Sequence, residues 1–432
     1  MSLQHVPQTN LALSVIQREK ATPKSLIQRP TLSETALYGL AGRIIKKLDP
    51  QTESHPAGNL MELLISFGSV VGRSAYYQVE DTRHYMNEMM VKVGESSRAR
   101  KGTGKNRIRA IMKHVDADWL DNRNTGGIGS GEVIPQLIRD SQFETVINKK
   151  TGESETVMMD SGVDDKRLHI NIGEFQGILS VCHRPESLLS SVIRDGWDSL
   201  PLRNTVKNNA ASCLEPHLSI AADTTVTDLS VNLDQADRNN GFANRFLWVF
   251  VHKNRELPMG GEPLDWTEEI QELRQAVGFT QQQKRIFMDK QARDYWTRTL
   301  YSKLEAEVPG LVGALTSRAS AHTIRLALLY AMLDKSDHIR LEHLEAAESL
   351  WQYCEDSVQT IFGDLLTPEQ QQILDYLIAG PATKTDLYRK CFQNHRKGPL
   401  IQNDLQVLLK TGKIEVEEDE NGLEFYSLKH PK

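Results

Sequence analysis

A basic loop that begins at a glycine constrains this chain more than any other feature. Residues 94–103 read G-E-S-S-R-A-R-K-G-T. This is close to the G-x-x-x-x-G-K-[ST] pattern of nucleotide-phosphate loops, in which backbone N–H groups surround the phosphates while a lysine and a hydroxyl reach the terminal phosphate and Mg²⁺. Here Gly94 opens the loop, the order at its end is Lys101-Gly102-Thr103, and one residue is added. The loop therefore predicts a phosphate site in an altered form.

The segments on either side of the loop favour the same interpretation. Residues 88–93 are apolar and β-branched, which predicts a strand, and residues 106–115 carry apolar side chains at helical spacing. A strand, a glycine loop and a helix suit a phosphate, because the positive end of the helix adds to the N–H groups of the loop. The alternative is a solvated basic loop that joins a strand to a helix.

Length and composition predict a soluble protein of two or three domains. The 432 residues are too many for one core, while 39% hydrophobic and 25% charged residues are ordinary for a globular chain. A net charge of -6 gives no sign of bulk nucleic-acid affinity, so any such surface must be local. The four cysteines are far apart, without a C-x-x-C pair, and no apolar run approaches a bilayer span. We therefore expect a cytoplasmic protein without a membrane partner.

The chain divides by pattern into four segments. Residues 1–31 are polar without periodicity and predict a flexible N-terminal arm. A nucleotide-binding core is expected over 32–265, a helical lid over 266–366 and a small separate domain over 367–432. Within the core, the polar stretch 142–166 predicts a protruding hairpin, which is either a contact arm or plain solvated surface.

A second constellation is the predicted strand 167–175, which ends in Glu174. A nucleotide hydrolase needs a carboxylate at the carboxyl end of a central strand, where it holds Mg²⁺ through water or aligns the attacking water. Gly173 stands where a second acid is usual, and His169 and Asn171 interrupt the apolar run. The alternative is that Glu174 caps the following helix.

Two further positions fit a nucleotide motor. The predicted strand 218–225 ends in hydroxyls and an acid, and Thr224 at such a position would sense the terminal phosphate; otherwise Asp223 or Thr224 caps the next helix. Arg245 precedes a strongly apolar strand and could reach a neighbouring subunit's phosphate as an arginine finger. The alternative for Arg245 is an ion pair within its own subunit.

The order of these motifs resembles a family of ATPases found in phages, plasmids and integrated elements. Many of its members are fused behind primase-polymerase domains and are described as primase-helicases or replicative helicases. The resemblance runs from about His55 to about Ser357, and its most specific part is the R-K-G-T form of the loop. The other matching motifs are residues 130–132 (S-G-E), 173–175 (G-E-F), 240–246 (N-G-F-A-N-R-F) and 325–331 (R-L-A-L-L-Y-A).

The resemblance implies a RecA-like or AAA+-like α/β P-loop ATPase core that uses ATP and Mg²⁺. On the matching positions, Lys101 and Thr103 would bind phosphate and Mg²⁺, Glu174 would be the acid at the strand end, and Arg245 would be the finger. Glu132 matches a glutamate of the family pattern and is an equal candidate for the catalytic base. The departures at Gly173, His169 and Asn171 concern hydrolysis more than binding.

The remaining segments predict a helical lid and a C-terminal winged helix. Helices are expected over 319–333 and 341–362, and Arg318 and Arg325 share one face, where they would sense the nucleotide unless that face is solvated or ion-paired. Three short helices and a hairpin in the tail form the winged-helix pattern. The acidic wing 415–420 favours a protein partner. The basic residues of the same segment suit phosphate contacts instead, and they are Arg389, Lys390, Arg396 and Lys397.

Together these features predict an ATP-dependent DNA helicase or translocase that serves replication of a mobile element. Its expected partners are DNA, further copies of the chain in a ring such as a hexamer, and a primase or other replication protein. The alternative is an ATP- and DNA-binding assembly or initiator module, including a defence component, that does not unwind DNA.

Overall fold

The core of the protein is a five-stranded, all-parallel sheet with the spatial order β11-β3-β10-β7-β4. The computed structural model describes residues 29–96, 98–147, 154–204, 210–233, 237, 240–363, 366, 368–420 and 422–429. The prediction of an α/β fold is thereby confirmed, and most of the predicted arm over 1–31 lies outside the described residues. The strands are β3 (Met89–Val93), β4 (Asn124–Thr125), β7 (Arg167–Ile172), β10 (His217–Thr224) and β11 (Leu247–Phe250).

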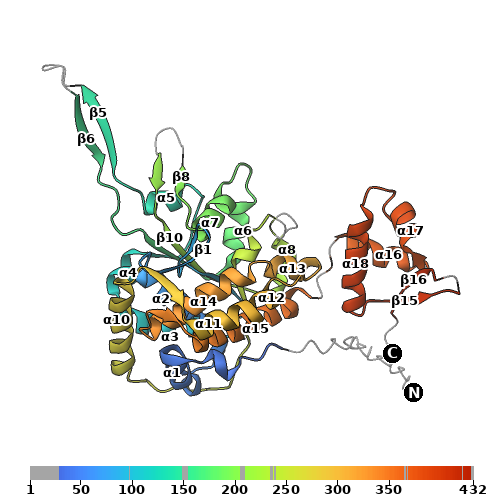
Figure 1. Ribbon diagram of the computed structural model, residues 1–432, viewed down its shortest axis with the longest axis horizontal. Helices are drawn as coiled ribbons and strands as arrows, with labels where there is room; N and C mark the ends of the chain where they lie inside the picture. Colours follow the sequence, from blue (N-terminus) through green and yellow to red (C-terminus); the bar gives the residue numbers. More distant parts are fainter. Residues whose placement is uncertain are drawn as a thin grey trace, which may run out of the picture.

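Helices cover both faces of this sheet, as Figure 1 shows. Side chains alternate between the faces of a strand, so Met90 packs with helices α2 (Pro56–Val71) and α3 (Lys101–Val115), whereas Met89 and Val91 pack on the opposite face. Burial on both faces explains the continuous apolar character of these strands. The helices of the opposite face are α6 (Phe175–Cys182), α7 (Leu189–Trp197) and α8 (Val226–Asn232).

Strand β3 lies inside the sheet, between two strands that follow it in the chain. It is hydrogen-bonded on one side to β10 and on the other to β11, both of which come later in the chain. In open α/β sheets, ligands bind outside the carboxyl ends of the strands where the winding reverses. The loop that follows β3 therefore lies at the favoured binding edge.

A second sheet joins distant parts of the chain, in the order β13-β12-β1-β2. Strand β2 of this sheet ends at His84, shortly before β3 of the parallel sheet begins at Met89. The second sheet also crosses the predicted boundary between the core and the lid. Its strands are β1 (Tyr76–Val79), β2 (Thr82–His84), β12 (Arg285–Met288) and β13 (His338–Ile339).

The helices after residue 266 pack into the core. Helix α14 (Ala319–Leu333) is almost wholly buried, and α15 (Leu341–Phe362) packs against α14 and β11. Leu315 and the end of α15 belong to the apolar cluster on the opposite face of the parallel sheet, whereas most of the segment shares one apolar cluster with α1 and α2. The other helices of this cluster and its surroundings are α1 (Gly39–Leu48), α10 (Thr267–Gln281), α11 (Lys290–Tyr295), α12 (Tyr301–Leu304) and α13 (Gly310–Thr316).

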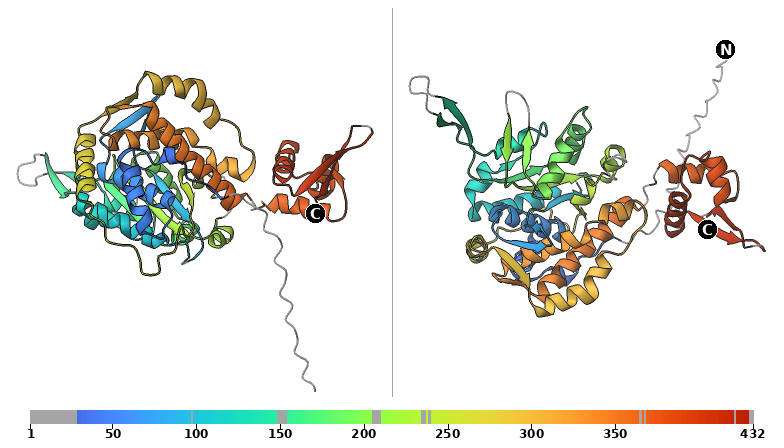
Figure 2. Two further views of the ribbon diagram at one scale, coloured as in Figure 1. Left: turned by 90° about the horizontal axis from the view of Figure 1, so that it is seen from below. Right: turned by 45° about the horizontal axis from the view of Figure 1, so that its top comes forward.

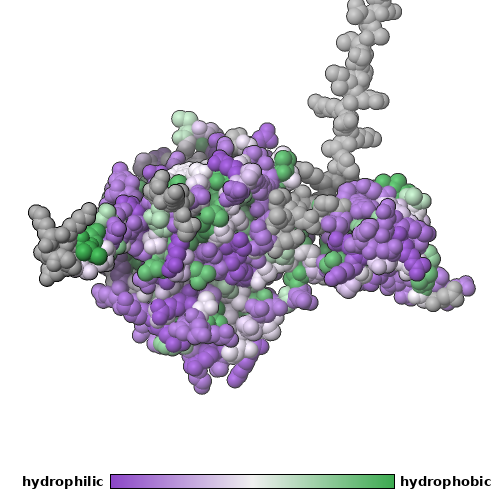
Figure 3. Space-filling view, turned by 90° about the horizontal axis from the view of Figure 1, so that it is seen from above, coloured by the Kyte–Doolittle hydropathy of each residue, from purple (hydrophilic) through white to green (hydrophobic). Residues whose placement is uncertain are grey.

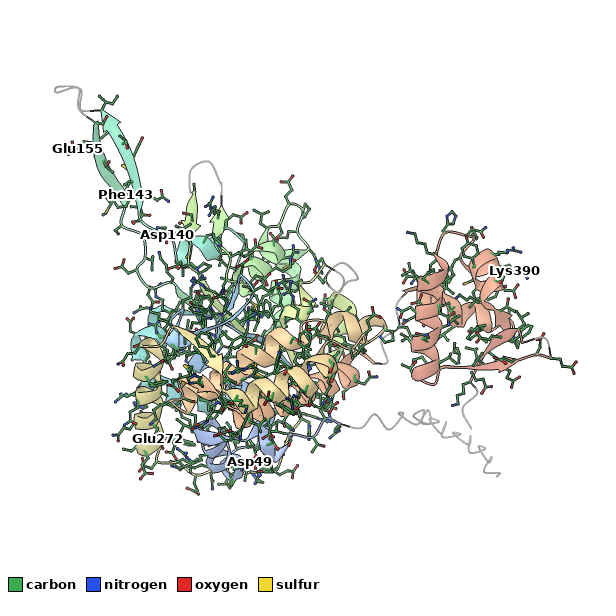
Figure 4. The ribbon with its side chains drawn as sticks, viewed as in Figure 1. Asp49, Asp140, Phe143, Glu155, Glu272 and Lys390 are labelled. Carbon is green, nitrogen blue, oxygen red and sulfur yellow. The ribbon has the colours of Figure 1, made fainter. Side chains whose placement is uncertain are left out.

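Two hairpins project from the body of the protein, as Figures 1 and 2 show. The predicted protrusion is observed as β5 (Gln142–Ile147) and β6 (Ser154–Asp160); its centre, residues 148–153, lies outside the described residues. Phe143 and Glu155 lie on this arm and Asp140 lies at its base (Figure 4). The second hairpin and the short elements near it are β8 (Leu202–Asn204), β9 (Ala211–Cys213), α4 (Ala117–Asn122) and α5 (Val133–Leu137).

The C-terminal segment forms a small unit with its own apolar core. Figures 1 and 2 show it beside the rest of the chain, where α18 contacts α13. The predicted helices and hairpin are present, and the wing strand β16 pairs with β15 and β14. The elements are α16 (Pro368–Leu377), β14 (Ala382–Thr383), α17 (Lys384–Asp386), α18 (Gly398–Lys410), β15 (Ile414–Glu418) and β16 (Glu424–Leu428).

Across the described ranges, no helix combines the length and the apolar character needed to cross a bilayer.

Candidate functional site

A cleft of about 610 Å³ opens at the carboxyl edge of the parallel sheet. It collects residues from three places in the sequence: the loop after β3 with the start of α3, the end of β7, and the end of β10. Seven residues considered in the sequence analysis line it together: Lys101, Gly102, Thr103, Gly173, Glu174, Asp223 and Thr224. The structure thus brings the three predicted strand ends to one site.

The loop between β3 and α3 is held close to its neighbours at its first residue. A Cβ at Gly94 would lie 2.3 Å from the backbone oxygen of Val251 and 2.8 Å from the Cβ of Ala99. The Gly94 N–H donates to the Thr224 carbonyl at 3.2 Å, which ties the loop to β10. Gly94 is therefore required for close backbone approach, and its role is to shape the loop.

Lys101 is the first residue of α3 and its amine folds back over the loop. Its Nζ donates to the carbonyl of Gly94 at 2.8 Å and lies 3.4 Å from that of Glu95. Burial lowers the pKa of this amine below its usual range. A lysine amine held by carbonyls at a helix N-terminus is placed to exchange those contacts for an anion in the cleft.

Gly102 and Thr103 follow on the exposed first turn of α3. A Cβ at Gly102 would meet no atom within 4 Å, so this side of the cleft is open. The Thr103 hydroxyl belongs to the cleft lining, where it is available to a metal ion or a phosphate. The swapped order of lysine and glycine thus leaves both the amine and the hydroxyl at the cleft.

The acid at the end of β7 is exposed in the cleft. Glu174 stands at the N-cap position of α6, but its side chain makes no capping hydrogen bond. The capping alternative is therefore not what the structure shows. At the end of β10, neither Asp223 nor Thr224 caps α8; Thr225 does, accepting from the Asp228 N–H at 3.1 Å. Glu174 and Thr224 are both left to face the cleft.

Beneath the cleft lies a buried charge network that sequence reasoning missed. Lys92, in the middle of β3 and 3% exposed, donates from Nζ to Glu62 Oε2 at 2.7 Å and lies 3.3 Å from Asp223 Oδ1. Asn171 Nδ2 donates to the other Glu62 oxygen at 3.2 Å. The available signals were a lysine inside an apolar strand and a glutamate inside the apolar run of α2.

Three predicted arginines lie together at the opposite, amino edge of the sheet. Arg245, Arg318 and Arg325 all contact the ring of Trp197, with guanidinium carbons 5.8, 4.9 and 3.7 Å from its centroid. This is the edge at which β3 begins. Arg325 donates to the carbonyl of Asn87, just before the first residue of β3, at 3.2 Å. None of the three lines the cleft of its own chain.

The contacts of these arginines are structural. Arg245 forms a 2.5 Å ion pair with Asp198, which is the intramolecular alternative to an arginine finger, and Arg318 lies 3.4 Å from the same carboxylate. Arg325 is 1% exposed and donates to the Trp197 carbonyl at 2.8 Å, and burial lowers its pKa to about 10. The ion pair of Arg318 agrees with the alternative given for this face, and nucleotide sensing by Arg318 and Arg325 stays a prediction.

Glu132 does not line the cleft either. It precedes α5, its carbonyl accepts from Asn204 Nδ2 at 3.0 Å, and a hydrogen bond from Ser130 lowers the pKa of its carboxyl. The structure therefore separates the two candidates for a catalytic base and leaves Glu174 alone at the site.

The basic residues of the C-terminal unit differ in their availability. Arg396 is held in ion pairs with Asp404 at 2.6 Å and Glu369 at 3.4 Å, so its charge is already compensated within the unit. Lys390 is exposed and pairs with Asp386 at 2.8 Å (Figure 4), while Arg389 and Lys397 are exposed. A nucleic-acid surface here would rest on the three exposed side chains.

The residues of the cleft fit a nucleotide with Mg²⁺ better than a metal bound by protein alone. Within the described ranges, no group of three or more His, Cys, Asp or Glu side chains gathers as a metal site. Mg²⁺ needs no such cage, because it is usually held by one or two carboxylates together with substrate phosphates and water. Comparison with protein-family models and with curated proteins found no match to this chain.

Proposed function

We propose that this protein is a nucleoside triphosphatase that binds ATP with Mg²⁺ in the Lys101 cleft and uses it to drive movement along DNA. The observation that carries the nucleotide assignment is the placement of Lys101 at the N-terminus of α3, with its amine over the loop carbonyls and facing a cleft that also holds Thr103 and Glu174. A positive charge and a hydroxyl at a helix N-terminus suit the phosphates and Mg²⁺ of a nucleoside triphosphate.

The arrangement of the core supports the same proposal. The phosphate loop follows β3, a central strand of an all-parallel sheet. The hydroxyl of β10, which pairs with β3, and the acid of β7, which pairs with β10, line the same cleft. The DNA helicase or translocase activity rests on the motif resemblance and on the exposed basic residues of the C-terminal unit, which support a DNA partner. Ring formation and a primase partner are proposed on the resemblance alone.

The nucleotide assignment is tested with Lys101→Ala. We expect ATP affinity to fall by at least 10-fold, because the amine is lost from the phosphate site. The thermal unfolding midpoint should stay close to that of the wild type, since the side chain is only half-buried in the first turn of α3. Lys113→Ala, an exposed lysine in the last turn of the same helix, is the matched control and should bind ATP as the wild type does. Equal ATP affinity in Lys101→Ala and wild type would reject the site.

The motor activity is tested by adding single-stranded DNA to the wild-type protein and measuring ATP turnover. Stimulation of turnover supports a helicase or translocase. ATP binding without turnover supports instead an assembly or initiator module, which the single acid at the end of β7 favours.

A further inference from the structure

The end of β7 supplies one acid where a nucleotide hydrolase commonly has two. Gly173 and Glu174 are both exposed in the cleft, and Gly173 has no side chain to offer a metal ion. A Cβ at Gly173 would meet no atom within 4 Å, so space for an acidic side chain exists at this position. The P-loop hydroxyl usually shares its Mg²⁺ with such an acid.

A carboxylate from the neighbouring strand lies in the same cleft. Asp223 is on β10, between the loop strand β3 and β7, and lies opposite Lys92 in the register of the sheet. It is 6% exposed and lines the cleft together with Thr103 and Glu174. β10 thus places an acid one strand nearer to the phosphate loop than Gly173 would.

The negative charge of Asp223 has weaker polar contacts to compensate it than that of Glu62, its buried neighbour. Lys92 is 2.7 Å from Glu62 and 3.3 Å from Asp223, and Glu62 also accepts from Asn171. Burial raises the pKa of Asp223, in spite of the opposing effects of Lys92 and Lys105. Because a buried carboxylate costs free energy unless a cation compensates it, a divalent ion in the cleft would stabilise Asp223.

We propose that Asp223 is the carboxylate that holds the divalent cation of the nucleotide, together with the Thr103 hydroxyl, and that it replaces the acid missing at Gly173. This inference rests on the proposed function, because nucleotide phosphates supply the remaining ligands. Lys92 is then a positioning residue: its amine fixes the Asp223 carboxylate from below, through the contact between β3 and β10.

The test uses the full chain saturated with ADP and measures its affinity for Mn²⁺ from the electron paramagnetic resonance signal of the free ion. Asp223→Asn should weaken Mn²⁺ binding by about 10- to 100-fold, the usual effect of removing a residue that supports a metal site. Its affinity for ADP in EDTA should equal or exceed that of the wild type, because a negative charge near the phosphates is removed.

Two further variants separate a lost metal ligand from a general change in the cleft. Asp228→Asn removes another carboxylate of the cleft lining, one whose Oδ2 already accepts from the Thr225 hydroxyl at 2.7 Å, and should keep wild-type Mn²⁺ affinity. In the Asp223→Asn background, Gly173→Asp should restore Mn²⁺ affinity, because it returns an acid to the open position at the end of β7.

The outcomes distinguish this inference from the proposed function. If wild type and Asp223→Asn both bind ADP and their Mn²⁺ affinities agree within about twofold, the inference is overturned and the nucleotide site stands. If Asp223→Asn unfolds, Thr103→Val decides: the exposed side chain can be replaced without loss of the fold, and a folded Thr103→Val protein with wild-type Mn²⁺ affinity overturns the inference. If the wild type binds neither ATP nor ADP, the proposed function fails and the inference fails with it.

Discussion

At the scale of single residues, the structure distinguishes acids that the sequence leaves equal. Glu174 and Glu132 each follow a glycine in a short motif, and either could align a water molecule. Only Glu174 lines the cleft, whereas Glu132 is bound to Ser130 near α5. The assignment of a catalytic base therefore depends on which strand end each residue follows.

The first prediction at this scale concerns turnover. Glu174→Gln should bind ATP with wild-type affinity but reduce the turnover rate by about 100-fold or more, because the amide keeps the size of the side chain and loses its basicity. Glu132→Gln is the control and should hydrolyse ATP at the wild-type rate. Steady-state phosphate release measures both rates, and a slow Glu132→Gln with a fast Glu174→Gln would reverse the assignment.

At the scale of elements, the β5–β6 arm exposes several large apolar side chains, which is unusual for a hairpin surrounded by solvent. Phe143 and Met158 are directly paired across the strands and are 58% and 56% exposed, and Ile147 lies on the same face. Figure 3 shows apolar side chains at this end of the molecule, beside the residues in grey. This placement favours the contact-arm interpretation over plain solvated surface.

The arm should be dispensable for folding and for the nucleotide site. Replacing residues 143–159 by Asn-Gly keeps the pairing of Gln142 with Asp160 and the 2.5 Å contact of Asp160 with Arg139. We expect a free energy of unfolding within about 1 kcal/mol of the wild type, because the removed side chains are exposed. Urea denaturation measures this value.

A full-length variant with Phe143→Thr and Ile147→Thr is the control, since it changes only the apolar face of the arm. Both proteins should bind ATP as the wild type does. A shortened protein that fails to fold, or that loses ATP affinity while the threonine variant keeps it, would show that the arm supports the core.

At the scale of the whole molecule, the fold buries histidines whose pKa values fall well below the usual range. Burial lowers the pKa of His55, His84 and His217 to about 3 and that of His169 to about 4. These residues come from α2, β2, β7 and β10 or their ends, so their burial is a property of the assembled core. Protonation in the unfolded chain occurs near pH 6.5.

The protein should lose stability as the pH falls below about 6.5. The folded pKa values lie below the unfolded value, so the unfolded chain binds more protons between about pH 6.5 and pH 4, and the free energy of unfolding is highest above this window. Between pH 7.5 and pH 5.5 we expect a loss of roughly 1 kcal/mol for each histidine. Urea denaturation at several pH values measures the slope.

His169→Phe provides the matched control for this slope. Neither ring nitrogen of His169 has a hydrogen-bond partner in the described structure, and the ring packs 5.4 Å from that of Trp119, so a phenyl ring keeps the packing. The variant should keep its stability at pH 7.5 and show a shallower pH dependence. An unchanged slope would show that His169 is protonated in the folded protein.

The sequence by itself determined the local elements of the site. The strand before Gly94, the helix after it and the strand that ends at Glu174 were predicted from apolar periodicity and glycine placement, because these signals depend on residues near one another in the chain. The α/β class was implied by the motif resemblance, whereas the three helices and hairpin of the C-terminal unit were predicted from periodicity and turn signals. The sequence did not predict that one sheet crosses the boundary near 265, since its paired strands β1 and β12 are more than 200 residues apart in the chain.

The tertiary structure alone decided which side chains meet. Glu62, Lys92 and Asp223 come from a helix and two strands, and only the register of β3 with β10 places the last two side by side. The position of Arg245 just before β11 and the packing of α14, which carries Arg325, place both arginines at the amino edge of the sheet, away from the cleft. The physical reason is that the pairing register of parallel strands decides which side chains lie next to each other and on which face of the sheet. This register is not defined until the strands have paired.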